Sequence, residues 1–288
     1  MRQLLLPLFL LLCCTALPLR AQYAPGNQVS ESYLKAHGHA SFFKVTPIPD
    51  DVFARMQGKS YKAGCPVKRS ELRYLRCLHR TADGRALVGE MVLHQRIAND
   101  VLDILRQLFE ARYPIERMQL IDNYDGDDGR SMAANNSSAF NYRKVPGKAV
   151  LSRHAYGMAV DINPLYNPYI YHKNGRRIVD PKAGAPYADR SRKHPYMIRR
   201  NDLCCRLFLA KGFRWGGDWK YSKDYQHFDK KYGVRLGICP LASSESVIES
   251  DAPHSHAPQS TFCKLPASFV VRTPFRSSTH GAMGVGFL

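Results

Sequence analysis

The segment Leu151–Ile162 contains a histidine and an aspartate of the kind that a hydrolytic metal site requires. Such a site needs three nitrogen or oxygen ligands and an open position for water. His154 and Asp161 are an odd number of residues apart, so in one continuous strand they would face opposite sides. Gly157 lets the chain turn between them, and Met158–Ile162 then predicts a buried strand whose carboxylate needs a partner. A cation would supply that partner, although this segment alone also fits a surface histidine and a hydrogen-bonded aspartate.

A second segment, Gly212–Asp229, adds a further histidine and a further carboxylate. It contains both tryptophans of the chain and ends in an Asp-x-x-His pair formed by Asp224 and His227. A carboxylate three residues from a metal-binding histidine can lie over the attacking water without binding the metal. The two segments together predict three metal ligands and a general base.

The order of these motifs resembles the M15 family of zinc peptidases. The pattern is S-x-H-x-x-G-x-A-x-D, followed by W-G-G-D-W and D-x-x-H-F, within about Met118–Tyr232. The resemblance implies that His154, Asp161 and His227 bind Zn²⁺ and that Asp224 is the base. It also implies the M15 or hedgehog-like DD-peptidase fold and hydrolysis of an amide bond in peptidoglycan stem peptides.

The resemblance leaves the cleaved bond and one arginine open. The family includes D-alanyl-D-alanine carboxypeptidases, vancomycin-resistance dipeptidases and L-alanyl-D-glutamate endopeptidases of phage endolysins. The aspartate at position 224 resembles the pattern of the endopeptidase-type subgroup, because the D,D-dipeptidases carry Glu at the corresponding position. Arg143 is implied to contact the substrate and stabilise the developing oxyanion. Arg130 is a rival, because other members place their arginine farther ahead of the first histidine.

Other residues of the two motifs are candidates to contact the ligands or the substrate. Asp218 could orient His227, replace Asp224 as the base, or only stabilise a turn. The remaining candidates are polar or aromatic neighbours of the motifs: Ser152, Tyr156, Trp215, Trp219 and Tyr225.

Periodicity upstream of the motifs predicts the elements that must position them. Two apolar runs around Ala82-Asp83-Gly84 predict a hairpin, and apolar residues at three- and four-residue intervals predict a helix. We therefore expect an α+β fold with a small antiparallel sheet and flanking helices. The expected elements are strands Leu72–His79, Ala86–His94 and Met118–Asp122, and helices Gln95–Arg112 and Asp202–Lys211.

The N-terminus and the charge predict export to the cell envelope. Met1-Arg2, the apolar run Leu4–Leu12 and the small residue Ala21 together predict a signal peptide over residues 1–21, which makes the mature protein periplasmic or secreted. The chain has 288 residues, 44% of them hydrophobic, which excludes a disordered chain. Its net charge of +18 favours anionic partners, and export favours envelope polymers over nucleic acid.

The cysteines and the ends of the chain add further expectations. Six cysteines follow the predicted signal and contain no C-x-x-C pair, so we expect disulfides of open connectivity rather than a cysteine metal site. We expect an N-terminal arm over 22–64, the peptidase domain over 65–240 and a low-complexity tail over 241–288. The segment Tyr166–Arg200 is expected to be a basic loop, acting as a lid or as an envelope contact.

Two other functions fit the sequence. One is a non-catalytic, zinc-containing module that binds the cell wall. The other is a basic protein that binds anionic polymers without zinc, and its affinity would fall steeply with salt. The oligomeric state is left open.

Overall fold

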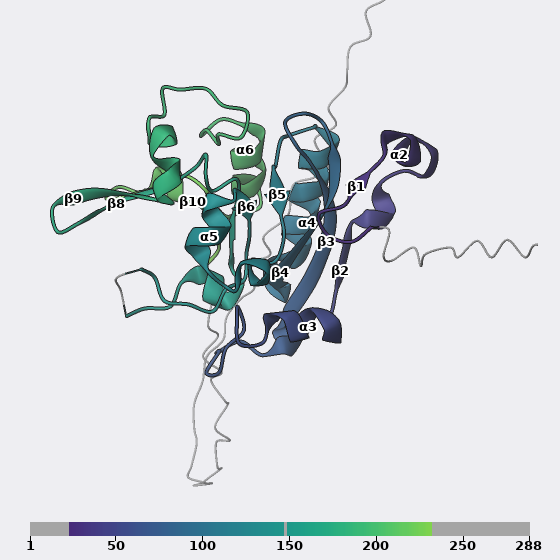
Figure 1. Cartoon of the computed structure of the whole chain (residues 1–288), viewed down its shortest axis with the longest axis horizontal. Coiled ribbons are helices and arrows are strands. Elements are labelled where there is room, and N and C mark those ends of the chain that lie inside the picture. Colours follow the sequence, from purple (N-terminus) through teal and green to yellow (C-terminus); the bar gives the residue numbers. More distant parts are fainter. Residues whose placement is uncertain (1–22, 147–148, 232–288) are drawn as a thin grey trace, which may run out of the picture. The chain divides into compact units, whose positions relative to one another are not determined.

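The two longest strands, β3 (Leu72–Arg80) and β4 (Ala86–His94), form the hairpin that the Asp-Gly turn predicts (Figure 1). Gly84 has a φ of 87°, a conformation that glycine adopts without strain. The computed structural model describes residues 23–146 and 149–231, which lie within one unit, and the predicted signal peptide and tail lie outside the described residues.

The segment expected to be an arm supplies both edge strands of the main sheet. Its strand order is β1-β4-β3-β2, and both outer strands pair antiparallel with the hairpin. These short strands lack a hydrophobic period because they are only two and three residues long. The arm contains β1 (Gln28–Val29), α2 (Glu31–His37), a 3-10 helix at Ala40–Phe42, β2 (Lys44–Thr46) and α3 (Asp50–Met56).

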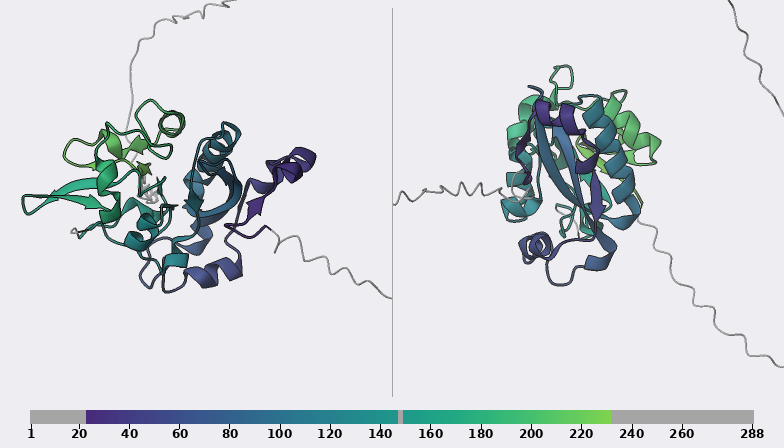
Figure 2. Two further views of the ribbon diagram at one scale, coloured as in Figure 1. Left: turned by 45° about the horizontal axis from the view of Figure 1, so that its top comes forward. Right: turned by 90° about the vertical axis from the view of Figure 1, so that its right-hand side faces the viewer.

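The amphipathic helix expected after the hairpin is α4 (Gln95–Glu110), which packs against β3 (Figure 2). The side chain of His94 caps its first turn by accepting a hydrogen bond from the backbone N–H of Arg96. The predicted apolar positions are buried: Ile97, Val101, Ile104, Leu105 and Leu108. The second expected helix is α6 (Leu203–Ala210), capped by Asp202, and it packs against α4.

The rest of the described chain consists of short elements in three small sheets. One contains β5 and β6 in parallel, and the other two have the antiparallel orders β10-β12-β7 and β11-β8-β9. The strands are β5 (Arg117–Met118), β6 (Asn136–Ser137), β7 (Ala159–Asp161), β8 (Tyr169–Lys173), β9 (Arg176–Asp180), β10 (Arg214–Trp215), β11 (Lys223–Asp224) and β12 (His227–Asp229). The helices are α5 (Asp128–Ala133) and the 3-10 helices η2 (Arg69–Glu71), η3 (Ile121–Tyr124), η4 (Arg153–Tyr156), η5 (Lys182–Ala188) and η6 (Gly216–Asp218). This mixture of helices and small, mostly antiparallel sheets is compatible with the expected α+β fold.

The strand predicted over Met118–Asp122 is wrong beyond its first residue. The side chain of Asn136 accepts a hydrogen bond from the Gln119 N–H and donates one to the Gln119 carbonyl. These bonds occupy the backbone groups that a continuing strand would need. The chain then turns into η3, where Asp122 accepts the backbone N–H of Ser60.

No disulfide joins any two of the four cysteines that the structure describes, so the disulfide prediction is wrong for pairs among them. Cys65, Cys77, Cys204 and Cys205 are free, and the remaining mature cysteines, Cys239 and Cys263, lie outside the described residues. Cys77, Cys204 and Cys205 are buried in the main apolar core, where a thiol packs as a small hydrophobic group.

Among the helices of the described ranges, none combines the length and the apolar character needed to span a lipid bilayer.

Candidate metal centre and catalytic site

The short sheet β10-β12-β7 brings two of the predicted ligands side by side. Asp161 on β7 lies directly opposite His227 on β12 in the antiparallel register. Residues directly opposite each other in such a pair point to the same face of the sheet. His154 joins them from η4, after which the chain turns at Gly157.

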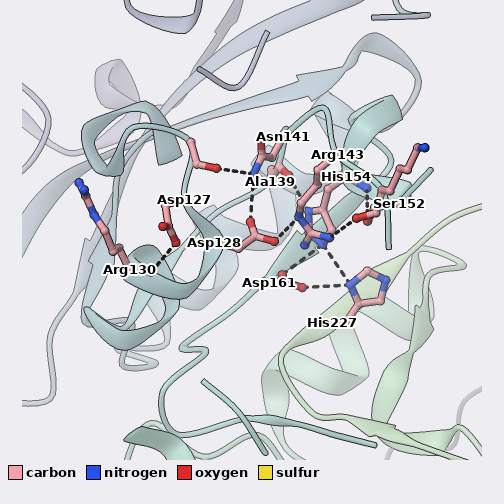
Figure 3. Close-up of polar contacts among 12 residues, drawn as sticks. Asp127, Asp128, Arg130, Ala139, Asn141, Arg143, Ser152, His154, Asp161 and His227 are labelled. Atoms are coloured by element: carbon pink, nitrogen blue, oxygen red, sulfur yellow. Dashed lines mark hydrogen bonds and ion pairs between the residues drawn. The ribbon is translucent and has the colours of Figure 1, made fainter. Parts of the chain in front are cut away.

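The donor atoms of these three side chains lie within hydrogen-bonding distance of one another. Asp161 Oδ1 is 3.0 Å from His227 Nδ1, and Asp161 Oδ2 is 3.1 Å from His154 Nε2. The two imidazole nitrogens are 3.2 Å apart (Figure 3). All three residues are buried and together form a group that can hold a metal ion.

The backbone fixes which nitrogen of His154 faces the cluster. His154 Nδ1 lies 2.6 Å from the carbonyl oxygen of Ala139, an acceptor that requires the proton to be on Nδ1. The Nε2 lone pair is then free to bind a cation, and the hydrogen bond also orients the ring. Ser152 fixes the same turn by accepting the backbone N–H of His154 at 3.3 Å.

Electrostatics couple the three groups. Burial opposes ionisation of Asp161, but the imidazoles of His154 and His227 outweigh it and hold the pKa of that carboxyl well below its usual range. Burial acts to lower the pKa of His154, and the adjacent Asp161 carboxylate outweighs burial and raises it. The cluster is therefore built around a permanent carboxylate charge.

Gly157 is required where the ligand turn meets the main sheet. Its φ is 63°, and a Cβ at this position would lie 2.7 Å from the backbone nitrogen of His94. That nitrogen donates a hydrogen bond to the Gly157 carbonyl at 2.9 Å. The contact ties the turn that carries His154 to the end of β4.

Asp224, the predicted base, lies on β11, three residues before His227. Burial raises its pKa to about 7, and Oδ1 has no hydrogen-bond partner among the described residues. Gly216 makes room for it, because a Cβ there would lie 2.5 Å from the Asp224 carbonyl oxygen. This close approach explains the first glycine of the W-G-G-D-W motif.

The two candidate arginines lie in different surroundings. The guanidinium of Arg143 is 24% exposed, lines the cavity at the ligand cluster and forms an ion pair with Asp128. Arg130 is 57% exposed, pairs with Asp125 and points away from the cluster (Figure 3). Of the two, only Arg143 lies where it can contact a substrate in that cavity.

The other candidates divide into residues inside and outside the cavity. Ser152, Tyr156 and Trp219 line it, and the Trp219 ring contacts the His227 ring edge to face at 5.4 Å between centroids. Trp215 is buried in the core, where its indole N–H donates to the Tyr225 carbonyl. Neither Trp215 nor Tyr225 lines the cavity.

Asp218 also lies away from the cluster. Its side chain is 46% exposed and pairs with Arg200 at 3.1 Å. It neither lines the cavity nor touches His227, so the structure favours the turn among the roles considered for it.

The cavity over the cluster has a volume of about 660 Å³ and contains residues that the sequence did not single out. The Asn174-Gly175 pair is a hairpin signal that would have predicted β8 and β9. These two strands carry the cavity residues Tyr169 and Asp180. The lining residues outside the predicted set are Asp128, Met132, Val145, Pro146, Val150, Leu151, Arg153, Tyr169, Asp180, Gln226 and Asp229.

The donor set fits Zn²⁺. A tetrahedral zinc ion with ligands at about 2.0–2.1 Å holds them roughly 3.3 Å apart, close to the separations of these three donors. Two imidazoles and one carboxylate are a zinc donor set that leaves a fourth position open. Asp224, whose buried Oδ1 has no hydrogen-bond partner among the described residues, lines the same cavity and adds an acceptor there.

Comparison with known proteins gives one family match. Residues 146–230 match the family model described as D-alanyl-D-alanine carboxypeptidase, which is an M15 peptidase model. This match supports an M15 peptidase over residues 146–230. The M15 segment contains all three candidate ligands and Asp224, and it begins after Arg143. No solved structure was found to match the chain.

Proposed function

We propose that the protein is an exported zinc peptidase that hydrolyses an amide bond in peptidoglycan stem peptides. The observation that carries the proposal is the convergence of His154, Asp161 and His227 beneath a cavity that Asp224 and Arg143 also line. The M15 match supports the substrate class. The cleaved bond is that of an endopeptidase or of a D,D- or L,D-carboxypeptidase.

His154, Asp161 and His227 would hold the zinc ion. When bound, zinc acidifies a water molecule and polarises the carbonyl of the scissile amide. The protein's contribution is to orient the three ligands, which it does through the Ala139 carbonyl and the β7–β12 register. Burial excludes other water from the ligand atoms, and it thereby strengthens every electrostatic contact at the site.

Asp224 would accept a proton from the attacking water and return it to the leaving amine. Burial of Asp224 shifts its pKa upward, toward the working pH at which general acid–base catalysis is most efficient. The absence of a side chain at Gly216 allows the backbone of Asp224 to pack closely against it.

Arg143 would stabilise negative charge on the substrate, either the developing oxyanion or a terminal carboxylate. Its ion pair with Asp128 fixes the guanidinium, and Asp128 is itself held by the side-chain N–H of Asn141 at 3.0 Å. A fixed donor stabilises a transition state better than a mobile one, because its reorganisation costs less.

The test is to incubate the full mature protein, with zinc or with a chelator, with peptidoglycan and defined stem peptides, and to identify the products by mass spectrometry. We expect zinc-dependent cleavage whose product masses identify the bond. Asp224→Asn is expected to lower turnover by about 10²- to 10⁴-fold without releasing zinc.

Asp218→Asn is the matched control, because it removes a carboxylate from the same segment outside the cavity. It is expected to keep wild-type turnover. Zinc bound at His154, Asp161 and His227 without any cleavage would contradict the proposal and favour a zinc-containing wall-binding module.

A further inference from the structure

The β8–β9 hairpin projects from the rest of its unit (Figure 1), and its inner residues Tyr169 and Asp180 line the cavity. Its register pairs Tyr169 with Asp180, Tyr171 with Ile178, and Lys173 with Arg176. Alternate residues of a strand share a face, and residues directly opposite in an antiparallel pair point to the same side. These six residues therefore form one face of the hairpin, here called the cavity face.

The inner end of the cavity face belongs to the catalytic cavity. Tyr169 and Asp180 both line that cavity, and the backbone of Tyr169 pairs with Asp224. The rings of Tyr169 and Tyr171 stack with centroids 4.6 Å apart, which continues the surface outward along β8. A substrate in the cavity would therefore meet an aromatic strip that leads toward the tip.

The outer end of the cavity face is cationic and exposed. Residues 172–177 are all exposed, and no ion pair within the described ranges involves Lys173 or Arg176. Most arginines elsewhere in the described chain have a carboxylate partner, as Arg55 has Glu90 and Arg214 has Asp229. Unpaired cations at the end of a surface that starts in the active site are free to bind an anionic part of the substrate.

We propose that the cavity face binds polymeric peptidoglycan beyond the cleaved bond, with Lys173 and Arg176 pairing with stem-peptide carboxylates. This inference rests on the proposed function. Four residue steps along β8 place Lys173 about 14 Å from Tyr169, so the contacted groups belong to the polymer and not to a short peptide in the cavity. The tyrosine rings supply flat apolar surface between the two ends.

Charge favours a carboxylate-rich polymer over a neutral glycan as the occupant. The segment Tyr166–Arg200 contains nine lysines and arginines but only two aspartates. An arginine fork matches the geometry of a carboxylate. The opposite face of the hairpin pairs His172 with Arg177 and does not include the cavity residues, so it serves as an internal control.

The test measures how much of the full mature protein pellets with insoluble peptidoglycan sacculi in the presence of a chelator, so that binding is scored without cleavage. Arg176→Gln is expected to weaken binding about threefold, and Lys173→Gln/Arg176→Gln about tenfold, as expected for one and two exposed charge pairs. Arg177→Gln, an equal charge change on the next residue, is expected to keep wild-type binding. Amidation of the sacculus carboxylates is expected to abolish the difference between the variants.

Several outcomes would overturn the inference. Equal loss in Arg176→Gln and Arg177→Gln would indicate attraction by net charge without a defined face. If Arg176→Gln still bound more weakly than Arg177→Gln to amidated sacculi, carboxylates would be excluded as the ligand. If the two variants differed as much in binding to phosphatidylglycerol vesicles as in binding to sacculi, the ligand would be a membrane surface instead.

Cleavage of a short soluble stem peptide separates this inference from the proposed function. The hairpin variants are expected to cleave that peptide at the wild-type rate, because only the polymer reaches the tip. Loss of sacculus binding with normal peptide cleavage supports the cavity face, whereas failure of every variant and the wild type to cleave the peptide counts against the proposed function alone.

Discussion

The region that carries the main sheet and the region that carries the ligands are stabilised in different ways. The first contains β3 and β4, nine residues each, with α4 packed on them through fully buried aliphatic side chains. The second contains strands of two or three residues around the cluster. Long backbone ladders and apolar packing stabilise the first region, whereas the second has too few ladder bonds to fix its own geometry.

Buried asparagines supply what the short strands lack. Asn167 accepts the Ile198 N–H at 2.7 Å and donates to the Tyr196 carbonyl at 2.8 Å. Asn163 accepts the Glu116 N–H and donates to the Pro114 carbonyl. Both side chains are fully buried. Stability and site geometry therefore have separate sources in this chain. Four predictions test this separation.

The largest effect is expected from Leu105→Ala on α4. Truncating this fully buried side chain should lower the free energy of unfolding by about 2–5 kcal/mol, because it leaves a cavity in the core. Zinc affinity of the folded protein should stay unchanged. Urea unfolding and a zinc competition titration measure the two quantities, and a marked loss of zinc affinity would break the proposed separation.

Asn167→Ala is expected to do less to stability and more to the site. It leaves buried backbone groups of Tyr196 and Ile198 without partners, which should cost about 1–3 kcal/mol. Because Asn167 also donates to the Asn163 carbonyl just after β7, zinc affinity should fall as well. Exposed Asn201→Ala, measured by the same two methods, should change neither.

Asp128→Asn tests whether the ion pair positions Arg143. Removing the carboxylate should lower kcat/KM about tenfold, a loss of about 1.4 kcal/mol, with zinc affinity and the unfolding free energy unchanged. Asp128→Glu should recover part of the loss. Asp125→Asn, which removes the exposed partner of Arg130, should have no effect on kcat/KM, and an equal loss there would reverse the roles of the two arginines.

The last prediction concerns the pH dependence of stability in metal-free protein. Burial raises the pKa of Asp224 from 3.8 to about 7, so the folded state holds this proton more tightly than the unfolded state does. Its contribution to stability is therefore complete below pH 4 and is lost as the pH rises toward 7. Between pH 5 and 7.5, wild type should lose more stability than Asp224→Asn in urea unfolding with a chelator, and parallel losses would contradict the pKa.

The parts of the fold that could be predicted are those specified by local pattern. The Asp-Gly hairpin and α4 follow from residues that are neighbours in sequence, and the helix was placed correctly to within two residues at its end. The helix α5 was missed because Asp127 caps it from within an acidic segment that indicates a loop. Its first residue, Asp128, is the partner of Arg143.

The candidate ligands could be proposed because their motifs are specific in type and order. Their mutual placement could not, because it depends on the β7–β12 register and on the Ala139 carbonyl, and neither has a signature in the motif residues. Tyr169 and Asp180 reach the cavity through a hairpin that a basic, tyrosine-rich composition concealed.

The hydrogen bond from His154 to the Ala139 carbonyl limits how far the molecule can be divided. The M15 match begins at residue 146, so the three candidate ligands lie inside the matched segment while this acceptor lies outside it. A fragment cut at that boundary would keep the ligand sequence but lose the group that selects the imidazole tautomer, and Arg143 with it. A graft of this centre onto another scaffold would have to carry the chain from α5 to β12 as one piece.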